Sequence, residues 1–309
     1  MNDKILNSLN KKGGVYSPYG VEKVLSFLKY ISENETPYPR YPVIEGIVDN
    51  NYIFHNTTCP NTDLEQHSRA VRIQGSHEFR DFDDLTACVS DFNEIANRDT
   101  NGKIPSILDS EDEWFHIVHP TPDSWASCAI INILYLNKKW QEEYEKSWTP
   151  LKFKSKDGIV EKNSFYSTHH LQYAKNEDGI FVRDYFEDGI EIVFADLKCP
   201  LSEKIIEDMI VSNKKYKIEL VKLTVPEIHE KGEFIETYDS GNNSIAIKQR
   251  ITFDCDSKGV EAAAVTFGTL RCCTCIINKT EPIVVTLDEP FYYFLIKNNT
   301  ILFAGQMKN

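Results

Sequence analysis

A run of small residues over 259–266 is the feature that most limits how this chain can fold. It follows a predicted strand over 245–254, and no helical spacing of apolar residues continues it. As a strand, it would gather four residues on one face: Val260, Ala262, Ala264 and Thr266. The other face would carry Glu261, Ala263 and Val265, with the carboxylate in water. Side chains this small can enter between two existing strands without clashes, so the segment is suited to insertion into a sheet.

Helices are predicted mainly in the first half of the chain and strands in the second. Apolar spacing predicts helices over 3–9, 17–31, 63–74, 84–96 and 201–211, the second opened by Ser17 as N-cap and Pro18. Strands are predicted over 15–16, 52–54, 78–82, 128–136, 180–186, 189–195, 216–225, 245–254, 283–287, 291–296 and 300–306. The apolar strand over 128–136 is expected to be buried on both faces. No repeat or long linker divides the 309 residues, so we expect one α+β domain over 1–309 with large antiparallel or mixed sheets.

The charge balance and the absence of long apolar stretches exclude several classes of partner. The chain has 34 basic and 47 acidic residues and a formal net charge of −13, which argues against nucleic acid as a partner. No apolar window reaches the length of a spanning helix, so no membrane partner is expected. The N-terminus lacks the pattern of a signal peptide, which favours a cytoplasmic protein with reduced cysteines. Glycosylation sequons, such as those at Asn34 and Asn56, leave secretion open.

No pattern of an enzyme active site is present. The sequence contains no GxxxxGKS/T, GxGxxG, HExxH or GxSxG motif, so neither catalysis nor a cofactor is expected. His169 and His170 are expected at the surface or half-buried, and the acidic run over 109–113 is expected to be a solvated turn without a partner. A thiol cluster is more distinctive: Cys272, Cys273 and Cys275. Because no second ligand group follows at useful spacing, we predict no metal site there and keep an oxidisable cluster as an alternative.

The segment around Gly259 resembles the hinge of the serpins. The serpin hinge reads Glu-Glu-Gly-Thr-Glu-Ala-Ala-Ala-x-Thr, and Gly259, residues 261–264 and Thr266 match it in register. Further segments are similar to serpin segments and follow in the family's order: Ser17-Pro18 at helix B, TNGKI at 100–104, NILYLNKKW at 132–140, LTVP at 223–226, PFYYF at 290–294 and ILFAG at 301–305. The resemblance therefore runs along nearly the whole chain.

This resemblance implies a fold and a mechanism. The fold would be a single serpin-like domain with a large mixed central sheet, smaller β-sheets and a reduced set of helices. A reactive-centre loop over about 259–285 would offer a bait bond to a protease, the expected partner of a monomeric chain. After cleavage the loop would insert as a strand and trap the acyl-enzyme. The implied hinge consists of Gly259, Val260, Glu261, Ala262, Ala263, Ala264 and Thr266. The implied shutter and breach, where the central sheet opens, contain Ser17, Asn132, Trp140 and Gln249.

The chain also departs from the family pattern. Too few residues lie between Thr36 and Tyr52 for helices C and D, so no heparin-type activation site is expected on helix D. The segment from Pro226 to Gln249 is too short for the helix usually found before the hinge strand. Poxvirus serpins are similarly trimmed, and the chain looks most like that group. Ser257 and Glu227 replace the family's Glu–Lys pair at the top of the hinge strand, and Gly20 replaces a shutter serine.

The position of the bait bond stays open. Counting forward from Gly259 puts it between Cys273 and Thr274, whereas counting back from Pro290 puts it between Lys279 and Thr280. Lysine would suit a trypsin-like pocket with an acidic group, and cysteine suits no common pocket. No Asp lies between Thr266 and Glu281, so a caspase-type preference is not supported.

Three functions are consistent with the sequence. The small hinge side chains favour a suicide inhibitor of a serine or cysteine protease. The missing helices, the lost Glu–Lys pair and the cysteine-rich loop favour the alternative, a non-inhibitory serpin-like interaction protein that modulates host or cellular pathways. A redox- or metal-linked role of the thiol cluster is the third interpretation. The first two differ in whether the hinge inserts.

Overall fold

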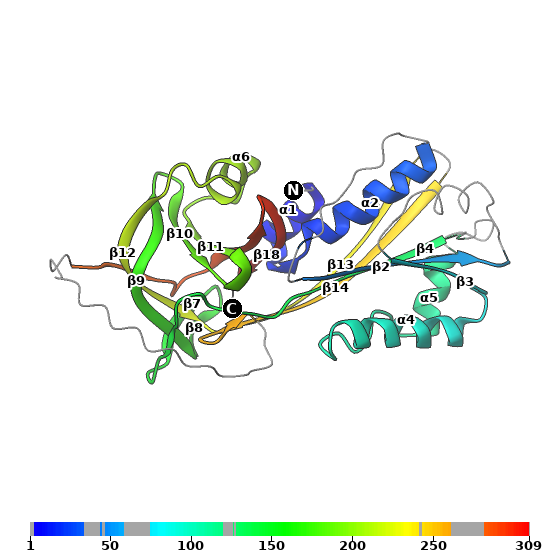
Figure 1. The fold of residues 1–309 in the computed structure, drawn as a ribbon, viewed down its shortest axis with the longest axis horizontal. Coiled ribbons are helices and arrows are strands. Elements are labelled where there is room, and N and C mark those ends of the chain that lie inside the picture. The colour runs from blue at the N-terminus through cyan, green and yellow to red at the C-terminus, as the bar shows by residue number, and fades with distance from the viewer. Residues whose placement is uncertain are drawn as a thin grey trace. The chain divides into compact units, whose positions relative to one another are not determined.

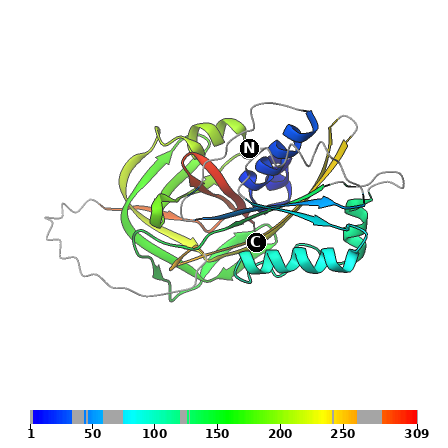
Figure 2. The same cartoon turned by 45° about the vertical axis from the view of Figure 1, so that its right-hand side comes forward.

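The chain divides into two compact units, which the computed structural model shows in Figures 1 and 2. The structure describes residues 3–33, 44, 47–58, 75–119, 126, 128–240, 243–260 and 281–308. The first unit comprises Met1–Val15, Asn137–Lys231 and Phe253–Asn309, and the second comprises Tyr16–Leu136 and Gly232–Thr252. The helix predicted over 63–74 lies outside the described residues.

A nine-stranded sheet forms the centre of the first unit. Its order is β1-β18-β17-β11-β10-β9-β12-β16, with β6 also paired to β9. These strands are β1 (Gly14–Tyr16), β6 (Glu145–Lys146), β9 (Ser164–Lys175), β10 (Gly179–Tyr185), β11 (Glu191–Leu197), β12 (Lys217–Pro226), β16 (Ile283–Thr286), β17 (Phe291–Lys297) and β18 (Thr300–Met307). β16 runs parallel to β12. The pairs β9–β10, β10–β11, β11–β17, β9–β12 and β17–β18 are antiparallel. The aromatic rings of Phe181, Phe194, Phe291 and Phe294 are buried here.

Local turn chemistry explains the two hairpins that the sequence predicts in this sheet. β10 and β11 pair in register around a short 3₁₀ turn, Glu187–Gly189, in which Asp188 has a φ of 59°. β17 and β18 are joined at Asn298 and Asn299, whose φ angles of 49° and 62° both lie in the left-handed region. Asparagine tolerates this region better than most residues, so a two-residue turn forms there.

Shorter elements complete the first unit. The helices are α1 (Asp3–Lys12) and α6 (Glu203–Ile205), which continues as a π-helical segment over Ile206–Val211. β7 (Leu151–Ser155) and β8 (Gly158–Lys162) form a separate hairpin that the sequence analysis did not predict. Two short strands, β5 (Lys138–Lys139) and β15 (Gly259–Val260), belong to a second sheet of order β13-β14-β15-β5.

The second unit packs helices on both faces of a three-stranded sheet (Figure 1). β2 (Val48–Asn56) lies between β3 (Gly75–Arg80), which is parallel to it, and β4 (Cys128–Tyr135), which is antiparallel. α2 (Pro18–Glu33) lies on one face, and α4 (Leu85–Asp99) and α5 (Glu111–Val118) lie on the other. The core on the α4 side contains Phe54, Phe82, Phe92, Trp114 and Ile133.

One prediction about β4 is wrong. The strand was expected to be buried on both faces, but Ile133 is its one buried residue and the others are half-buried. β4 pairs with β2 along one edge, and the described residues supply no strand hydrogen-bonded to the other edge. The apolar run therefore belongs to a strand with one open edge.

Two long strands continue the chain after β12. β13 (Ile228–Ser240) and β14 (Asn243–Asp256) are neighbours in the second sheet, and each contains one of the four boundaries between the units. β13 was not predicted. It occupies the segment in which a family helix was expected to be missing, and the described residues between Pro226 and Gln249 contain no helix. This absence is therefore confirmed for the described part of that segment.

Candidate functional site: hinge, breach and shutter

The predicted hinge begins as a strand that is held on both sides. In β15, Gly259 and Val260 pair with Asp256 and Cys255 of β14, and with Lys139 and Lys138 of β5. Both pairings are antiparallel. Val260 and Cys255 are fully buried, so this end of the hinge already has an inner face. The remaining predicted hinge residues lie outside the described part of the chain: Glu261, Ala262, Ala263, Ala264 and Thr266.

Gly259 is required by its surroundings. Its φ is 143°, a conformation that residues with a side chain rarely adopt. A Cβ at this position would lie 2.1 Å from the carbonyl oxygen of Lys138 and 2.7 Å from the Cα of Lys139. The close approach of the two backbones therefore explains the glycine at the start of β15.

The predicted breach tryptophan lies beside this strand. The indole of Trp140 is buried, and its Nε1 donates a hydrogen bond to the carbonyl oxygen of Asp256 at 2.7 Å. The ring stacks on Phe186, with centroids 4.2 Å apart, and contacts Tyr144 at 4.5 Å. Trp140 thus fixes the end of β14 from which β15 departs.

The predicted shutter residues come together in the second unit. The backbone N–H of Ser17 donates to Gln249 Oε1 at 2.9 Å, and Gln249 Nε2 donates to the carbonyl oxygen of Ser17 at 3.1 Å. Ser17 Oγ accepts from the backbone N–H of Gly20, which confirms the predicted N-cap of α2. A Cβ at Gly20 would lie 2.9 Å from Asn132 Oδ1 and 3.2 Å from Gln249 Nε2. Gly20 therefore leaves room for the side chains of both Asn132 and Gln249.

No family model matches the chain. It is 22% identical over 258 residues to an uncharacterized serpin-like protein of Methanosarcina acetivorans, covering 70% of this chain and 60% of that protein. It is 25% identical over 240 residues to Serpin-Z2 of Arabidopsis thaliana, covering 70% and 56%. The chain thus spans less than two thirds of the length of these curated relatives.

Solved structures match along almost the full chain. A cleaved Serpin 42Da superposes with a TM-score of 0.76 at 14% identity, covering 99% of this chain and 93% of that one. Serpin48 of the insect Tenebrio molitor superposes with a TM-score of 0.68 at 16% identity, covering 100% of this chain and 98% of that one. Thyroxine-binding globulin in complex with thyroxine superposes with a TM-score of 0.71 at 14% identity, covering 99% of this chain and 95% of that one.

This chain has the serpin fold. The predicted fold class, α+β with a large mixed sheet and smaller sheets, is thereby confirmed, and the names of the relatives support the serpin superfamily.

The family's ion pair at the breach is replaced in this serpin fold. Glu227 pairs with Lys146 at 3.2 Å and lies 3.8 Å from His229 Nε2. His229 Nδ1 lies 2.9 Å from Asp254 of β14. Because the Lys146 and His229 side chains are both about 60% exposed, these contacts are screened and contribute little stability.

A buried ion pair behind the shutter was missed by the sequence analysis. Lys23 of α2 pairs with Asp49 of β2 at 2.7 Å, and both side chains are less than a tenth exposed. Tyr19 donates to the same carboxylate at 2.7 Å, and Asn132 Nδ2 donates to it at 3.1 Å and to Asn51 Oδ1 at 3.0 Å. The spacing of Tyr19 and Lys23, four residues apart in a helix, was the available sign of this cluster.

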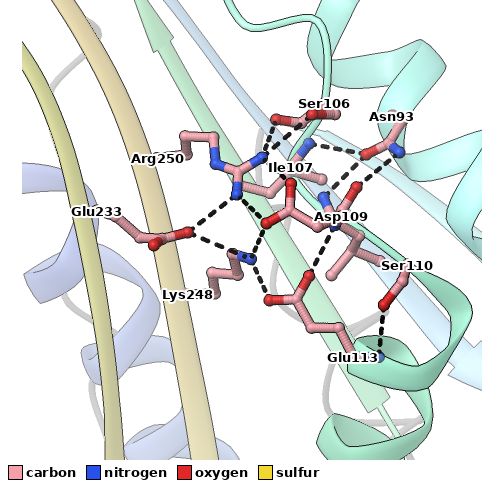
Figure 3. A network of polar contacts seen from close by, with 10 residues as sticks. Asn93, Ser106, Ile107, Asp109, Ser110, Glu113, Glu233, Lys248 and Arg250 are labelled. Carbon is pink, nitrogen blue, oxygen red and sulfur yellow. Dashed lines mark hydrogen bonds and ion pairs between the residues drawn. The ribbon is translucent and has the colours of Figure 1, made fainter.

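The prediction for the acidic run over 109–113 is wrong. The run opens α5, where Ser110 is the N-cap and accepts from the backbone N–H of Glu113 at 3.1 Å. Asp109 and Glu113 pair with Arg250 and Lys248 of β14 (Figure 3). These partners lie more than 130 residues away in sequence, so local pattern could not reveal them.

The histidine pair and two buried cysteines of the described residues give no sign of a reactive site. His169 is half-buried, 3.5 Å from Asp184, and His170 is exposed, as expected. Burial raises the pKa of the Cys88 thiol to about 11 and that of Cys255 well above its usual value, so both are unreactive. No metal-binding cluster and no helix able to span a membrane occur in the described ranges. The thiol cluster and both candidate bait bonds, at Cys273-Thr274 and Lys279-Thr280, fall outside them.

Proposed function

We propose that the protein is a serpin-type suicide inhibitor of a serine or cysteine protease and not an enzyme. The placement of β15 between β14 and β5 supports this proposal most directly, because it is where an inserted strand would start. The protease would cleave the reactive-centre loop and form an acyl-enzyme. The loop would then insert as a strand before the ester is hydrolysed, so inhibition is a race between two rates.

The register of β15 gives the inserted strand a definite path. In an antiparallel pair, each residue forward along one strand lies opposite one residue further back along its partner. Extending the pairing of Val260 with Cys255 takes Ala262 level with Phe253, and Ala264 level with Ile251. Phe253 and Ile251 are buried, so alanines suit these positions.

The same register predicts where the hinge meets the shutter. On the β14 side, Thr266 comes level with Gln249. On the other side, extending the pairing of Val260 with Lys138 takes Thr266 level with Asn132. Gln249 and Asn132 both have a side-chain atom close to Gly20. An inserted strand that kept both registers would therefore bring the hinge threonine to this shutter pair.

A second candidate is a non-inhibitory serpin-like interaction protein. The replaced breach pair, in which Glu227 contacts Lys146, favours it. One structural neighbour is described as thyroxine-binding globulin in complex with thyroxine, so the fold also serves a protein that carries a ligand. On this proposal the loop would stay uninserted.

The remaining sequence predictions belong to the same proposal. The chain is proposed to be a single serpin-like domain of the trimmed, poxvirus type, monomeric and cytoplasmic, whose partner is a protease of unknown identity. The short segment between Pro226 and Gln249, which holds strands and no helix among its described residues, supports the trimmed type.

Thermal unfolding before and after cleavage tests the proposal. The loop would be nicked between Thr266 and Lys279 with a broad protease, and the Tm of both forms would be measured. A large rise means that the loop inserts and that the native state was strained, and a protease panel scored for SDS-stable complexes would then find the target. No rise would contradict the inhibitor and favour the interaction protein.

A further inference from the structure

The segment 146–162, which contains the hairpin of β7 and β8, has a charge opposite in sign to that of the whole chain (Figure 1). It carries five lysines and two carboxylates, whereas the chain has a formal net charge of −13. Four of the five residues of β8 are exposed, so this strand covers no core. The segment therefore presents a positive surface on an acidic protein.

A fully exposed tryptophan lies just before the hairpin. Trp148 is 99% exposed, although most of the surface of an indole is usually buried. The turn that carries it is held by hydrogen bonds. The backbone N–H of Ser147 donates to the carbonyl oxygen of Ser164 at 2.8 Å, and Ser147 Oγ donates to the carbonyl oxygen of Thr149 at 2.8 Å. The backbone beneath the indole is thus fixed, while the indole itself is left to solvent.

The outer face of the hairpin places lysines beside an exposed isoleucine. Phe153 is fully buried, and side chains alternate along a strand, so Lys152 and Lys154 lie on the opposite, outer face. Ile159 is the cross-strand partner of Lys154 and lies on the same face, where it is 70% exposed. This face therefore combines apolar area with positive charge.

Two lysines of the segment keep a charge that no carboxylate in the described ranges neutralises. Lys146 and Lys154 pair with glutamates at 3.2 and 2.7 Å. Lys152 and Lys156 make no ion pair with any residue that the structure describes. Glu161 lies opposite Lys152 in the register of the hairpin, but no ion pair joins the two. Lys152 and Lys156 are thus available to an anion outside the chain.

The positive surface continues from the hairpin turn to the end of α1. Lys308 Nζ donates to the carbonyl oxygens of Asn10 and Lys11 at 3.0 and 3.1 Å. Burial and the nearby charge of Lys156 lower the pKa of Lys308. Lys11 and Lys12 are exposed at the same end of α1. An anion placed beside Lys156 would relieve the repulsion between these like charges.

The combination of groups fits an anionic lipid surface better than a protein. An indole is stable at the interface between bilayer and water and needs no pocket there, whereas a protein partner would need a pocket shaped for it. Lysines near such a surface are attracted to anionic headgroups. Lysines on an exposed strand also deter strand pairing, but that role does not account for Trp148. Because the net charge of −13 opposes approach to an anionic membrane, contact requires a local positive surface.

We propose that a hairpin patch, consisting of Trp148, Lys152, Lys156 and Ile159, binds the surface of membranes that contain anionic phospholipids. The indole and the isoleucine enter the interface, and the lysines contact the headgroups. No helix in the described ranges can span a membrane, and contact at the surface needs none. With two unpaired lysines and two apolar side chains, binding should be reversible and should fall as salt screens the charges.

Sedimentation with lipid vesicles tests the patch on the full, uncleaved chain. The vesicles are phosphatidylcholine alone, or phosphatidylcholine and phosphatidylserine at seven to three, both at low salt. We expect the parent to sediment with the mixed vesicles only. Replacing both Lys152 and Lys156 by Gln should weaken binding about fivefold per lysine. Trp148→Ala should weaken it about tenfold, because much of the apolar area of the indole leaves water in the bound state.

A matched pair of isoleucines locates the contact. Ile159→Ser should weaken binding about threefold or more, because its apolar side chain enters the interface. Ile218→Ser is the control, since Ile218 of β12 is 72% exposed and is preceded by the exposed Lys217. It should bind like the parent. All of the changed side chains are exposed, so every variant should keep the Tm of the parent.

Several results would overturn the proposal. One is a parent that sediments no better with the mixed vesicles than with phosphatidylcholine alone. If that parent is instead retained on immobilised polyglutamate through Lys152 and Lys156, the patch fits an acidic protein and not a membrane. Equal losses in Ile159→Ser and Ile218→Ser, or parental binding by Trp148→Ala, would also exclude the patch. None of these measurements involves a protease, so the failure of protease inhibition would leave the proposal as it stands.

Discussion

The two faces of β14 are held by opposite kinds of interaction. On the shutter face, Gln249 is half-buried and makes two neutral hydrogen bonds to the backbone of Ser17. On the opposite face, Arg250 and Lys248 make ion pairs to carboxylates that include the mostly exposed Asp109. Neutral hydrogen bonds do not depend on pH in this range, whereas ion pairs to carboxylates are lost when acid protonates the carboxylate. The two faces of β14 should therefore respond differently to pH.

The largest expected effect is a difference in protease trapping between hinge substitutions on the two faces of the inserted strand. If the loop inserts in the register of β15, Ala262 and Ala264 would face the shutter side of β14 and Ala263 the opposite side. Ala262→Arg or Ala264→Glu would force a charge against Phe253 or Ile251 and turn the inhibitor into a substrate. Ala263→Arg should keep most trapping. The yield of SDS-stable complex with a target protease measures this, and equal yields from all three variants would contradict the alternation.

The next effect concerns the neutral face. Gln249→Ala removes both side-chain hydrogen bonds to Ser17, so the uncleaved protein should lose about 1–3 kcal/mol of unfolding free energy. Urea unfolding of the uncleaved form measures it. If Gln249→Ala loses no more unfolding free energy than Arg250→Gln, the contact between Gln249 and Ser17 is not the more stabilising of the two.

A smaller, pH-dependent effect is expected on the charged face. Arg250→Gln should cost about 0.5–1 kcal/mol at pH 7, because these pairs are partly exposed. Hydrogen bonds from Arg250 lower the pKa of Asp109 and Glu233, so both carboxylates stabilise the folded state above their unfolded pKa of about 4. That stability is lost as the pH falls through the lower folded values. The Tm difference between parent and variant should therefore shrink from pH 7 to pH 3, and a constant difference would contradict the ionic origin.

The smallest effect is expected at the breach. Lys146→Ala removes the partner of Glu227, but the lysine side chain is 61% exposed. The unfolding free energy should change by less than about 1 kcal/mol, and the insertion rate should stay at the parent value. A larger loss of unfolding free energy would mean that the Glu227–Lys146 pair stabilises the fold more than its exposure predicts.

Local chemistry explains which features the sequence could predict. Ser17 caps α2 by accepting from the backbone N–H of Gly20, three residues later. Asn298 and Asn299 form a turn through their own positive φ angles. The hinge stays a prediction beyond Val260, and it rests on small side chains at alternate positions, which need no knowledge of their partners. Each of these signals lies within about ten residues of sequence.

The contacts that were missed depend on partners far along the chain. The carboxylate of Asp109 is 141 residues from Arg250, and an acidic run without its partners looks like a solvated turn. The apolar strand β4 was expected to be buried on both faces, since sequence does not show that one of its edges lacks a paired strand among the described residues. β13 was missed, and its two ends belong to different units.

The strand order of the nine-stranded sheet has a consequence for synthesis on the ribosome. β1 pairs with β18, which follows it nearly 290 residues later in the chain. At about 5–20 residues per second, translation takes roughly 15–60 s to deliver that partner. β17 and β18 also separate β1 from β11, so the emerging chain holds the edges of an unfinished sheet throughout this time. Chaperones that cover exposed strand edges would thus meet this protein before any protease does.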